Sequence, residues 1–211
     1  LTFTNRGKVY WTKVYKLPDA SRYSKGKAIV NLVGIEQDEK ISAVIIVKEF
    51  KDDEYLIFAT KSGLVKKTKL KAYSRPRKGG IWGINLREND DVISVVKTNG
   101  NNQLILATRE GMAVKFNETD VRPVSRHSMG VKGIKLKKKD DRVIGMVVAK
   151  EDKTLLTITE NGFGKRSPIT DYRLINRGGS GVINIKTTER NGGVAVIKSV
   201  TDEDELMLIS I

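Results

Sequence analysis

Residues 56–63 read LIFATKSG, a short apolar run that ends in a polar turn with a glycine. The pattern occurs three more times, as LTFTNRG (1–7), LILATREG (104–111) and LLTITENG (155–162). The intervals between successive turn glycines, Gly7, Gly63, Gly111 and Gly162, are 56, 48 and 51 residues. Recurrence at a nearly constant period of this length indicates a repeat architecture.

A second glycine recurs with the same period. It lies in GKAIVNL, GIWGINL, GVKGIKL and GSGVINI, at Gly26, Gly80, Gly130 and Gly179, ahead of an expected strand in each unit. These two anchors divide the chain into units 1–55, 56–103, 104–154 and 155–205, and the terminal ELMLISI predicts the start of a fifth unit at 206–211. We therefore expect residues 1–211 to form a single repeat domain, part of a larger disc.

Each unit has a β pattern. Short runs such as LIFAT, LVKKTKL, IWGINL and VISVVKT are rich in Val, Ile, Leu and Thr and are separated by Gly, Asn, Asp or Ser. Four strands in roughly 50 residues is the proportion of a propeller blade. The predicted fold is all-β, a propeller-like disc of four-stranded blades.

The composition limits the class of protein. The 211 residues hold 39 Lys and Arg against 25 Asp and Glu, a formal net charge of +14, and no cysteine. Such an excess favours a polyanionic partner, and the lack of cysteine excludes disulfides and cysteine metal sites. No apolar run approaches the roughly 20 residues of a membrane span, and LTFTNRG does not resemble a signal peptide. We expect a cytosolic protein.

Basic residues recur at fixed places in the units, whereas residues 36–54 and the DEDE at 202–205 are acidic. Because the basic positions follow the period of the repeat, we expect exposed side chains along one rim of the disc, and ordinary solubilising charge is the alternative. The candidate residues for binding a polyanion are Arg22, Lys66, Lys67, Arg75, Arg77, Lys78, Lys115, Arg126, Lys165, Arg166 and Arg177.

The kind of polyanion follows from what the pattern lacks. Aromatic residues make up only 6% of the chain, and Trp11 and Trp82 occupy strand patterns typical of core or inter-blade packing. Single-strand binders stack bases on exposed aromatics, and readers of base edges need a helix or ribbon for the major groove. The pattern favours contact with the phosphate backbone of duplex DNA, largely independent of sequence.

Catalytic signatures are missing. His127 is the only histidine and lies in a polar loop, where a surface or phosphate contact is the simpler interpretation. No Ser/His/Asp arrangement and no phosphate loop is present, since GFGKRS (162–167) lacks the upstream glycine and has Arg166 at the Ser/Thr position. No catalytic residue, metal site or cofactor is predicted in this chain.

Several stretches together resemble the C-terminal domain of the bacterial DNA gyrase A subunit. They are FTNRGKVYWTKVYKLPDASR (3–22), KAIVNLVGIEQDEKISAVI (27–45), ATKSGLVKKTKL (59–70), GVKGIKL (130–136), TENGFGKRSPITDY (159–172) and GVINIKTTERNGG (181–193). The resemblance implies a β-pinwheel, in which blades exchange strands, and a role in wrapping duplex DNA for ATP-dependent negative supercoiling. It implies that the catalytic tyrosine, ATP and Mg²⁺ belong to other parts of an A2B2 enzyme of the bacterial cytoplasm, at the nucleoid, so that the partners are DNA and the gyrase A and B subunits.

One hallmark of that family is a heptapeptide box, Q-R-R-G-G-[KR]-G, which we expect upstream of Leu1. INRGGSG (175–181) is a partial match, because Ile175, Asn176 and Ser180 depart from the box. Two alternatives stay open: the corresponding domain of topoisomerase IV, and a propeller-like scaffold whose basic rim binds acidic proteins.

Overall fold

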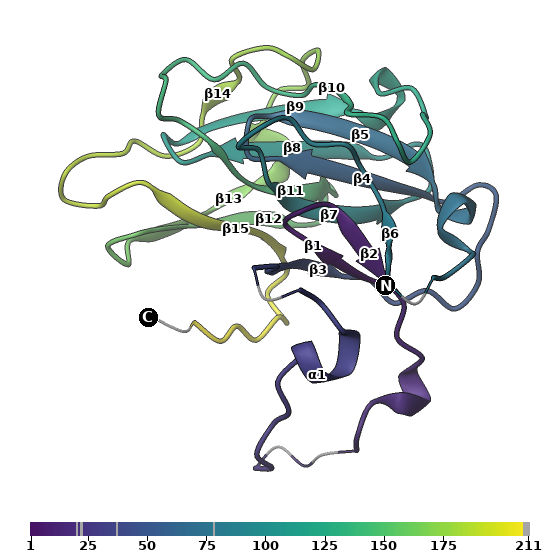
Figure 1. Ribbon diagram of the computed structural model, residues 1–211. Coiled ribbons are helices and arrows are strands. Elements are labelled where there is room, and N and C mark those ends of the chain that lie inside the picture. The colour runs from purple at the N-terminus through teal and green to yellow at the C-terminus, as the bar shows by residue number, and fades with distance from the viewer. Residues whose placement is uncertain (20, 22, 37, 78, 209–211) are drawn as a thin grey trace.

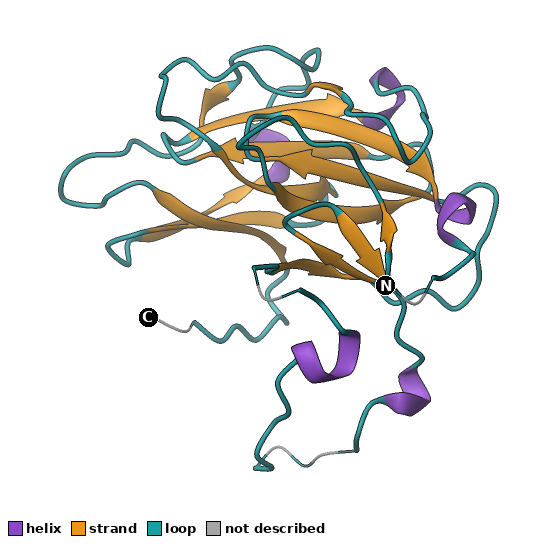
Figure 2. Cartoon of the chain, viewed as in Figure 1, coloured by secondary structure: helices purple, strands orange, loops and turns teal. Residues whose placement is uncertain are grey.

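The computed structural model describes residues 1–19, 21, 23–36, 38–77 and 79–208, and in this part of the chain fifteen strands form four antiparallel sheets, which we call blades 1 to 4 (Figures 1 and 2). Blade 1 contains β1 (Thr2–Thr4), β2 (Lys8–Tyr10), β3 (Ile41–Val44) and β6 (Ile81–Trp82). Blade 2 contains β4 (Tyr55–Thr60), β5 (Leu64–Lys69), β7 (Val92–Thr98) and β10 (Val131–Lys132). Blade 3 contains β8 (Gln103–Thr108), β9 (Met112–Asn117), β11 (Val143–Ala149) and β14 (Val182–Ile183). Blade 4 contains β12 (Thr154–Thr159), β13 (Gly164–Pro168) and β15 (Val194–Val200).

The blades are joined by strand exchange. The strand orders are β3-β1-β2-β6, β7-β4-β5-β10 and β11-β8-β9-β14, so the last strand of each of these blades comes from the next unit of the sequence. The first strands of successive blades lie next to one another, β3 by β7, β7 by β11 and β11 by β15. The exchanged strands therefore form the outer edge of the assembly. The all-β pinwheel prediction is confirmed.

The hydrophobic core lies between blades rather than within them. Alternate side chains of β4 point to opposite sides: Phe58 packs with Phe3 of blade 1, ring centroids 5.6 Å apart, whereas Ile57 packs with Leu104 of blade 3. A third cluster joins blades 3 and 4 through Ile105 and its neighbours. Strands buried on both faces read as continuous apolar runs, which explains LIFAT and LILAT.

The hairpin glycines couple neighbouring units. The carbonyl oxygens of Gly7, Gly63 and Gly111 accept hydrogen bonds from the backbone N–H groups of Gly83, Gly133 and Asn184, each at 2.8 Å. The donor in each case follows an exchanged strand. The same turn that closes a hairpin thus also holds the strand of the next unit.

Short helices lie between the strands of the units. They are η1 (Val14–Lys16), α1 (Val30–Val33), η2 (Leu70–Tyr73), η3 (Glu118–Asp120) and η4 (Ile169–Asp171). The strand expected after Gly26 is absent; α1 lies there, in a segment that extends away from the blades at the bottom of Figure 1. In the other units this strand pairs with the preceding unit, and within these 211 residues no unit precedes the first.

The second repeated glycine in the last unit is Gly181 rather than Gly179. Gly181 immediately precedes β14 with φ 76°, as Gly80 precedes β6 with φ 75° and Gly130 precedes β10 with φ 102°. A Cβ on Gly181 would lie 2.2 Å from the carbonyl oxygen of Ala113. Both conformation and close approach to the neighbouring blade require glycine at this position.

The start of a fifth unit stays a prediction. Residues 206–208 form no strand, and 209–211 lie outside the described residues. The boundaries of the four units likewise stay predictions.

Gly111→Ala should destabilise the protein far more than Gly162→Ala. Both glycines have φ 81°, so both variants pay the cost of a left-handed alanine, about 1–2 kcal/mol. Only at Gly111 would the added Cβ lie 2.0 Å from a backbone oxygen, that of Ile185, whereas Gly162 has open space. We expect Gly111→Ala to lower the free energy of unfolding by a further 1–3 kcal/mol, roughly the cost of overpacking. Urea unfolding of both variants measures this, and equal losses would contradict the inter-blade role of Gly111.

Candidate nucleic-acid interface

Three segments cross from a short helix to an exchanged strand at the outer edge. We call them the crossover loops: residues 74–80 between η2 and β6, 121–130 between η3 and β10, and 172–181 between η4 and β14. Each contains two arginines, and none contains an aspartate or glutamate. The arginines are Arg75, Arg77, Arg122, Arg126, Arg173 and Arg177. The crossover loops therefore carry positive charge without acidic residues at successive places along the outer edge.

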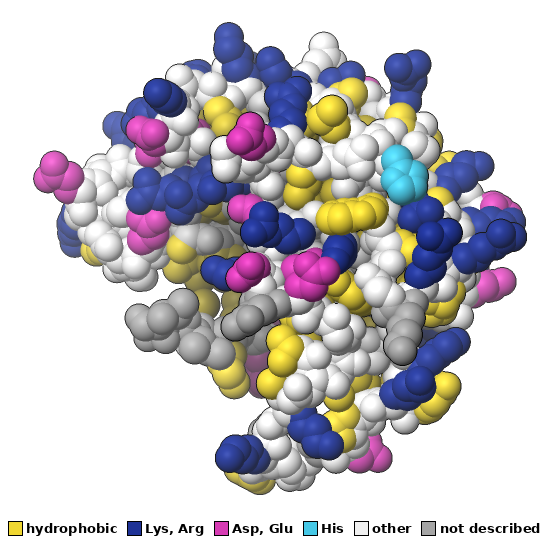
Figure 3. All heavy atoms as spheres, viewed as in Figure 1, with side chains coloured by type: hydrophobic (Ala, Val, Ile, Leu, Met, Phe, Trp, Pro, Cys, Tyr) yellow, Lys and Arg dark blue, Asp and Glu magenta, His cyan; other side chains and the backbone are white. Residues whose placement is uncertain are grey.

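Four of these arginines are exposed: Arg75, Arg77, Arg122 and Arg173. Figure 3 shows Lys and Arg side chains along the upper and right-hand margin of the visible face. Sequence reasoning missed Arg122 and Arg173, although the spacing of each to Arg126 and Arg177, four residues in both loops, was a usable signal. Their exposure leaves their guanidinium groups accessible to phosphate.

Arg126 and Arg177 are half-buried and help to fasten the edge. The Nη1 group of Arg126 donates to the carbonyl oxygen of Trp82 at 3.0 Å, and that of Arg177 donates to the carbonyl oxygen of Lys132 at 3.1 Å. Trp82 and Lys132 are the second residues of β6 and β10. Each arginine thus holds the exchanged strand of the preceding unit while part of its guanidinium stays accessible.

Two predicted rim lysines, Lys67 and Lys115, are buried instead, with 4% and 7% exposure. The Lys67 Nζ lies 2.8 Å from Glu118 Oε1, at the start of η3, and Lys115 Nζ donates to the Ile169 carbonyl of η4 at 3.1 Å. In unit 1 Trp11 occupies the same repeat position, and its Nε1 donates to the Tyr73 carbonyl of η2 at 2.9 Å. The position recurs because it ties each blade to the next short helix, and the prediction that it faces solvent is wrong.

The backbone of the same two lysines supports the crossover loops. The carbonyl oxygen of Lys67 accepts from the Val124 N–H at 2.8 Å, and that of Lys115 accepts from the Ile175 N–H at 2.9 Å. Side chain and main chain of one residue therefore fix both the helix and the loop that follows it. The buried lysines position the exposed arginines.

Lys66 is also buried, with 0% exposure, and its predicted exposure is wrong. Its Nζ donates to the carbonyl oxygens of Gly83 and Arg126, the second at 2.9 Å, and lies 5.2 Å from the centre of the Phe58 ring. Burial, and to a lesser degree the nearby Arg126 guanidinium, lowers the pKa of Lys66 to about 7. Through its hydrogen bond to the Arg126 carbonyl oxygen, Lys66 anchors the crossover loop 121–130.

The remaining candidates differ from one another. Lys165 and Arg166 on β13 are exposed, and Arg166 forms an ion pair of 2.7 Å with Asp202. Arg22 and Lys78 lie outside the described residues. Of the predicted DNA-binding residues, the structure therefore brings Arg75, Arg77, Arg126 and Arg177 to the crossover loops.

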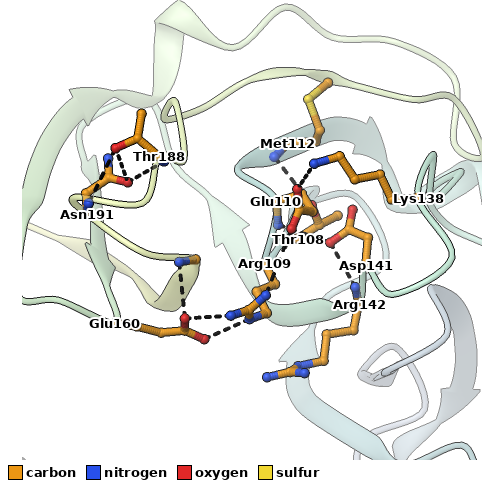
Figure 4. A network of polar contacts seen from close by, with 11 residues as sticks. Thr108, Arg109, Glu110, Met112, Lys138, Asp141, Arg142, Glu160, Thr188 and Asn191 are labelled. Atoms are coloured by element: carbon orange, nitrogen blue, oxygen red, sulfur yellow. Dashed lines mark hydrogen bonds and ion pairs between the residues drawn. The ribbon is translucent and has the colours of Figure 1, made fainter.

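A different polar network joins units 3 and 4 at the hairpin turns (Figure 4). The guanidinium of Arg109 donates to both carboxylate oxygens of Glu160 at 2.7 Å, and Glu110 pairs with Lys138. The Glu160 contact raises the pKa of Arg109, and Arg109 lowers that of Glu160. Because cations and carboxylates alternate here, this network neutralises itself and offers no anion site.

The described residues include the chain's only histidine, His127. His127 is exposed, as expected. Among them no three His, Asp or Glu side chains are grouped so as to hold a metal ion, and no helix has the length and apolarity to cross a membrane. What the crossover loops can do is bind phosphate by charge-assisted hydrogen bonds.

Lys67→Met should destabilise the fold, because it leaves the Glu118 carboxylate buried without its cation. Removing one partner of a buried pair costs about 3–5 kcal/mol. The double variant Lys67→Met/Glu118→Gln should recover much of the loss. Lys71→Met, which breaks the exposed pair with Asp52, is the control and should change little. Similar losses in the two single variants, measured by urea unfolding, would refute the role of Lys67.

The free energy of unfolding should increase with pH because the pKa of Lys66 is lowered in the folded protein. In the unfolded chain this lysine keeps its proton until near pH 10.5, whereas in the folded protein it loses it near pH 7. Between these values the unfolded state binds more protons, so the free energy of unfolding increases with pH. Relative to Lys66→Met, the wild type should gain stability between about pH 7 and 9. Lys165→Met, at an exposed site, should keep the wild-type slope, and a Lys66→Met protein that also keeps it would count against this assignment.

A family model described as "DNA gyrase C-terminal domain, beta-propeller" matches residues 1–48, 54–99, 102–150 and 153–210. The chain is 44% identical to the DNA gyrase A subunit of Staphylococcus epidermidis and 43% identical to that of Salmonella typhimurium, over 100% of this chain. It covers only 24% of those relatives, about a quarter of their length.

Solved structures show the same likeness. The C-terminal domain of a DNA topoisomerase IV has a TM-score of 0.85 at 32% identity, covering 95% of this chain and 63% of that one. A DNA gyrase A C-terminal domain has a TM-score of 0.83 at 28% identity, covering 96% and 66%. The E. coli ParC C-terminal domain, at 17% identity and a TM-score of 0.69 over 95% and 80%, shares the fold. With the family model matched along nearly the whole chain, this protein belongs to the family of DNA gyrase A C-terminal domains.

Proposed function

We propose that this chain binds duplex DNA through its phosphate backbone and bends it along the outer edge of the disc. The observation that carries the proposal is the composition of the crossover loops, each with two arginines and no acidic residue. A duplex that contacts several loops has to follow the curve of the edge. Bending 20–30 base pairs by 40–90° costs roughly 1–6 kcal/mol, which several ionic contacts offset.

The proposal places the chain within a larger enzyme. As part of a bacterial gyrase A subunit it would present a wrapped segment to the parts that cut and pass DNA, so that ATP-driven strand passage introduces negative supercoils. The catalytic tyrosine, ATP and Mg²⁺ would be supplied by those other parts, in an A2B2 assembly with the gyrase B subunit in the cytoplasm. The chain itself would be non-catalytic.

The structural likeness to a topoisomerase IV domain favours one alternative. A topoisomerase IV module would bind and steer DNA with less wrapping. Because both modules bind phosphate, affinity alone does not separate them, but the change in DNA linking number does.

The test is ligation of nicked circular DNA in the presence of the chain, followed by measurement of the linking number. Wrapping should shift the linking number in the positive direction, and binding should weaken roughly 10³–10⁵-fold between about 50 and 200 mM salt if six to ten phosphates are contacted. Replacing the four exposed loop arginines by glutamate should abolish both the binding of duplex DNA and the shift in linking number. The variant is Arg75→Glu/Arg77→Glu/Arg122→Glu/Arg173→Glu.

A matched control makes the same change in net charge on four exposed lysines outside the crossover loops. It is Lys40→Glu/Lys48→Glu/Lys51→Glu/Lys198→Glu, which should bind and wrap nearly as the wild type does. Equal losses in the two variants would show that net charge, not the loops, governs binding. DNA bound without a shift in linking number would favour topoisomerase-IV-like steering, and no binding to duplex would favour the protein scaffold.

A further inference from the structure

Strand β6 has a different hollow beside each of its two residues, Ile81 and Trp82, because successive side chains of a strand point to opposite faces. Among the described residues, the hollow beside Trp82 is lined by six carboxylates and four Lys or Arg side chains. Trp82 is 47% exposed there, so its interpretation as core packing is wrong. The mixed charge of this hollow favours no anion.

The hollow beside Ile81 has a volume of about 450 Å³, and its charged side chains are all cations among the described residues. It is lined from both crossover loops 74–80 and 121–130 and from η2, by Lys71, Ala72, Ser74, Arg75, Arg77, Ile81 and Arg126. Since Lys71 forms an ion pair with Asp52 at 2.7 Å, the three arginines supply the net charge. A water molecule occupies about 30 Å³ of liquid, so the hollow has room for a phosphate group and part of its hydration shell.

Arg126 is already fixed in position at this hollow. Its Nη1 group donates to the carbonyl oxygen of Trp82 at 3.0 Å, and its own carbonyl oxygen accepts from Lys66 Nζ at 2.9 Å. The Nδ2 group of Asn85 fastens the same loop through the His127 carbonyl oxygen at 2.7 Å. A guanidinium has five N–H donors, so the bond to Trp82 leaves donors for phosphate oxygens. Little side-chain freedom is then lost when an anion binds.

The repeat sets this place apart from the corresponding places in the later units. The helices η2, η3 and η4 each begin seven residues after the hairpin glycine of their unit, so their residues are equivalent. The third residue is Ala72 in η2, which lines the hollow, but Asp120 in η3 and Asp171 in η4, both exposed. Each aspartate lies two residues before a loop arginine, Arg122 or Arg173. A carboxylate there opposes the binding of an anion by Coulomb repulsion.

We propose that the hollow beside Ile81 is a binding site for a single phosphate group, shared by two units, and that Ala72 makes it selective for anions. Arg126 binds phosphate oxygens from its fixed position, and Arg75 and Arg77 bind them from the exposed loop, by charge-assisted hydrogen bonds. The site rests on the proposed function, because a phosphodiester of bound duplex DNA is the expected ligand. A free phosphate ion offers the same chemistry.

The first test uses the 211-residue chain and inorganic phosphate, which replaces chloride at constant ionic strength while amide resonances are followed by NMR. The backbone amides of loops 74–80 and 121–130 and the Nε–H group of Arg126 should shift together and saturate. Ala72→Asp should abolish this response, and because Ala72 is exposed the fold should be kept. The reverse change, Asp120→Ala, should strengthen the response of loops 121–130 and 172–181 above that of the wild type.

The second test measures the binding of duplex DNA at several salt concentrations. Loss of one phosphate contact in Ala72→Asp should reduce the slope of log K against log salt by about 0.9 and weaken binding roughly five- to tenfold near 0.1 M salt. Val44→Asp is the matched control, because it adds the same charge at an exposed site on the inner strand β3. It should keep the wild-type slope and the wild-type response to phosphate.

The outcomes separate this site from the proposed function. No saturable response in the wild type, or an equal response in Ala72→Asp, would overturn the site while leaving DNA binding by the loops intact. No gain in Asp120→Ala would overturn the role given to Ala72. A response lost in Ala72→Asp with an unchanged salt slope would support the site and assign it to free phosphate. A wild-type chain that binds phosphate in the hollow but binds no duplex would support the site and overturn the proposed function.

Discussion

The structure depends on one repeated contact, the backbone hydrogen bond from an exchanged strand to a hairpin glycine of the preceding unit. The carbonyl oxygens of Gly7, Gly63 and Gly111 accept these bonds at 2.8 Å. The positive φ that closes each hairpin also points its carbonyl toward the next unit, where a side chain would collide. Since no four-stranded blade is completed by its own unit, neighbouring units stabilise one another, and the disc is continuous.

The short helices and crossover loops are built on this frame. The residue four positions after the hairpin glycine, Lys67 in blade 2 and Lys115 in blade 3, bonds to the next short helix through its side chain and to the next crossover loop through its carbonyl oxygen. Burying a lysine is costly unless it is paired, and the Glu118 carboxylate and the Ile169 carbonyl meet that need. These buried lysines therefore stabilise the contact between blades, whereas four of the loop arginines, Arg75, Arg77, Arg122 and Arg173, are exposed to solvent.

Paired charges and unpaired positive charge lie in different parts of the fold. The hairpin turns carry both positive and negative side chains that pair with one another, as Arg109 does with Glu160. The crossover loops have only cations, and their arginines extend along the outer edge. A binding surface that carries only positive charge on a curved support suits phosphate contact that does not depend on base sequence.

The sequence by itself determined the period, the β class and the hairpin glycines, because turn geometry and two-sided burial act on neighbouring residues and leave a local pattern. It also indicated, through family resemblance, the strand exchange. Which basic residues reach solvent was decided only by the tertiary structure. Lys66 and Arg75 share one basic stretch, yet one is fully buried and the other exposed, because burial depends on the helix and loop that the next unit, dozens of residues away, places over each side chain.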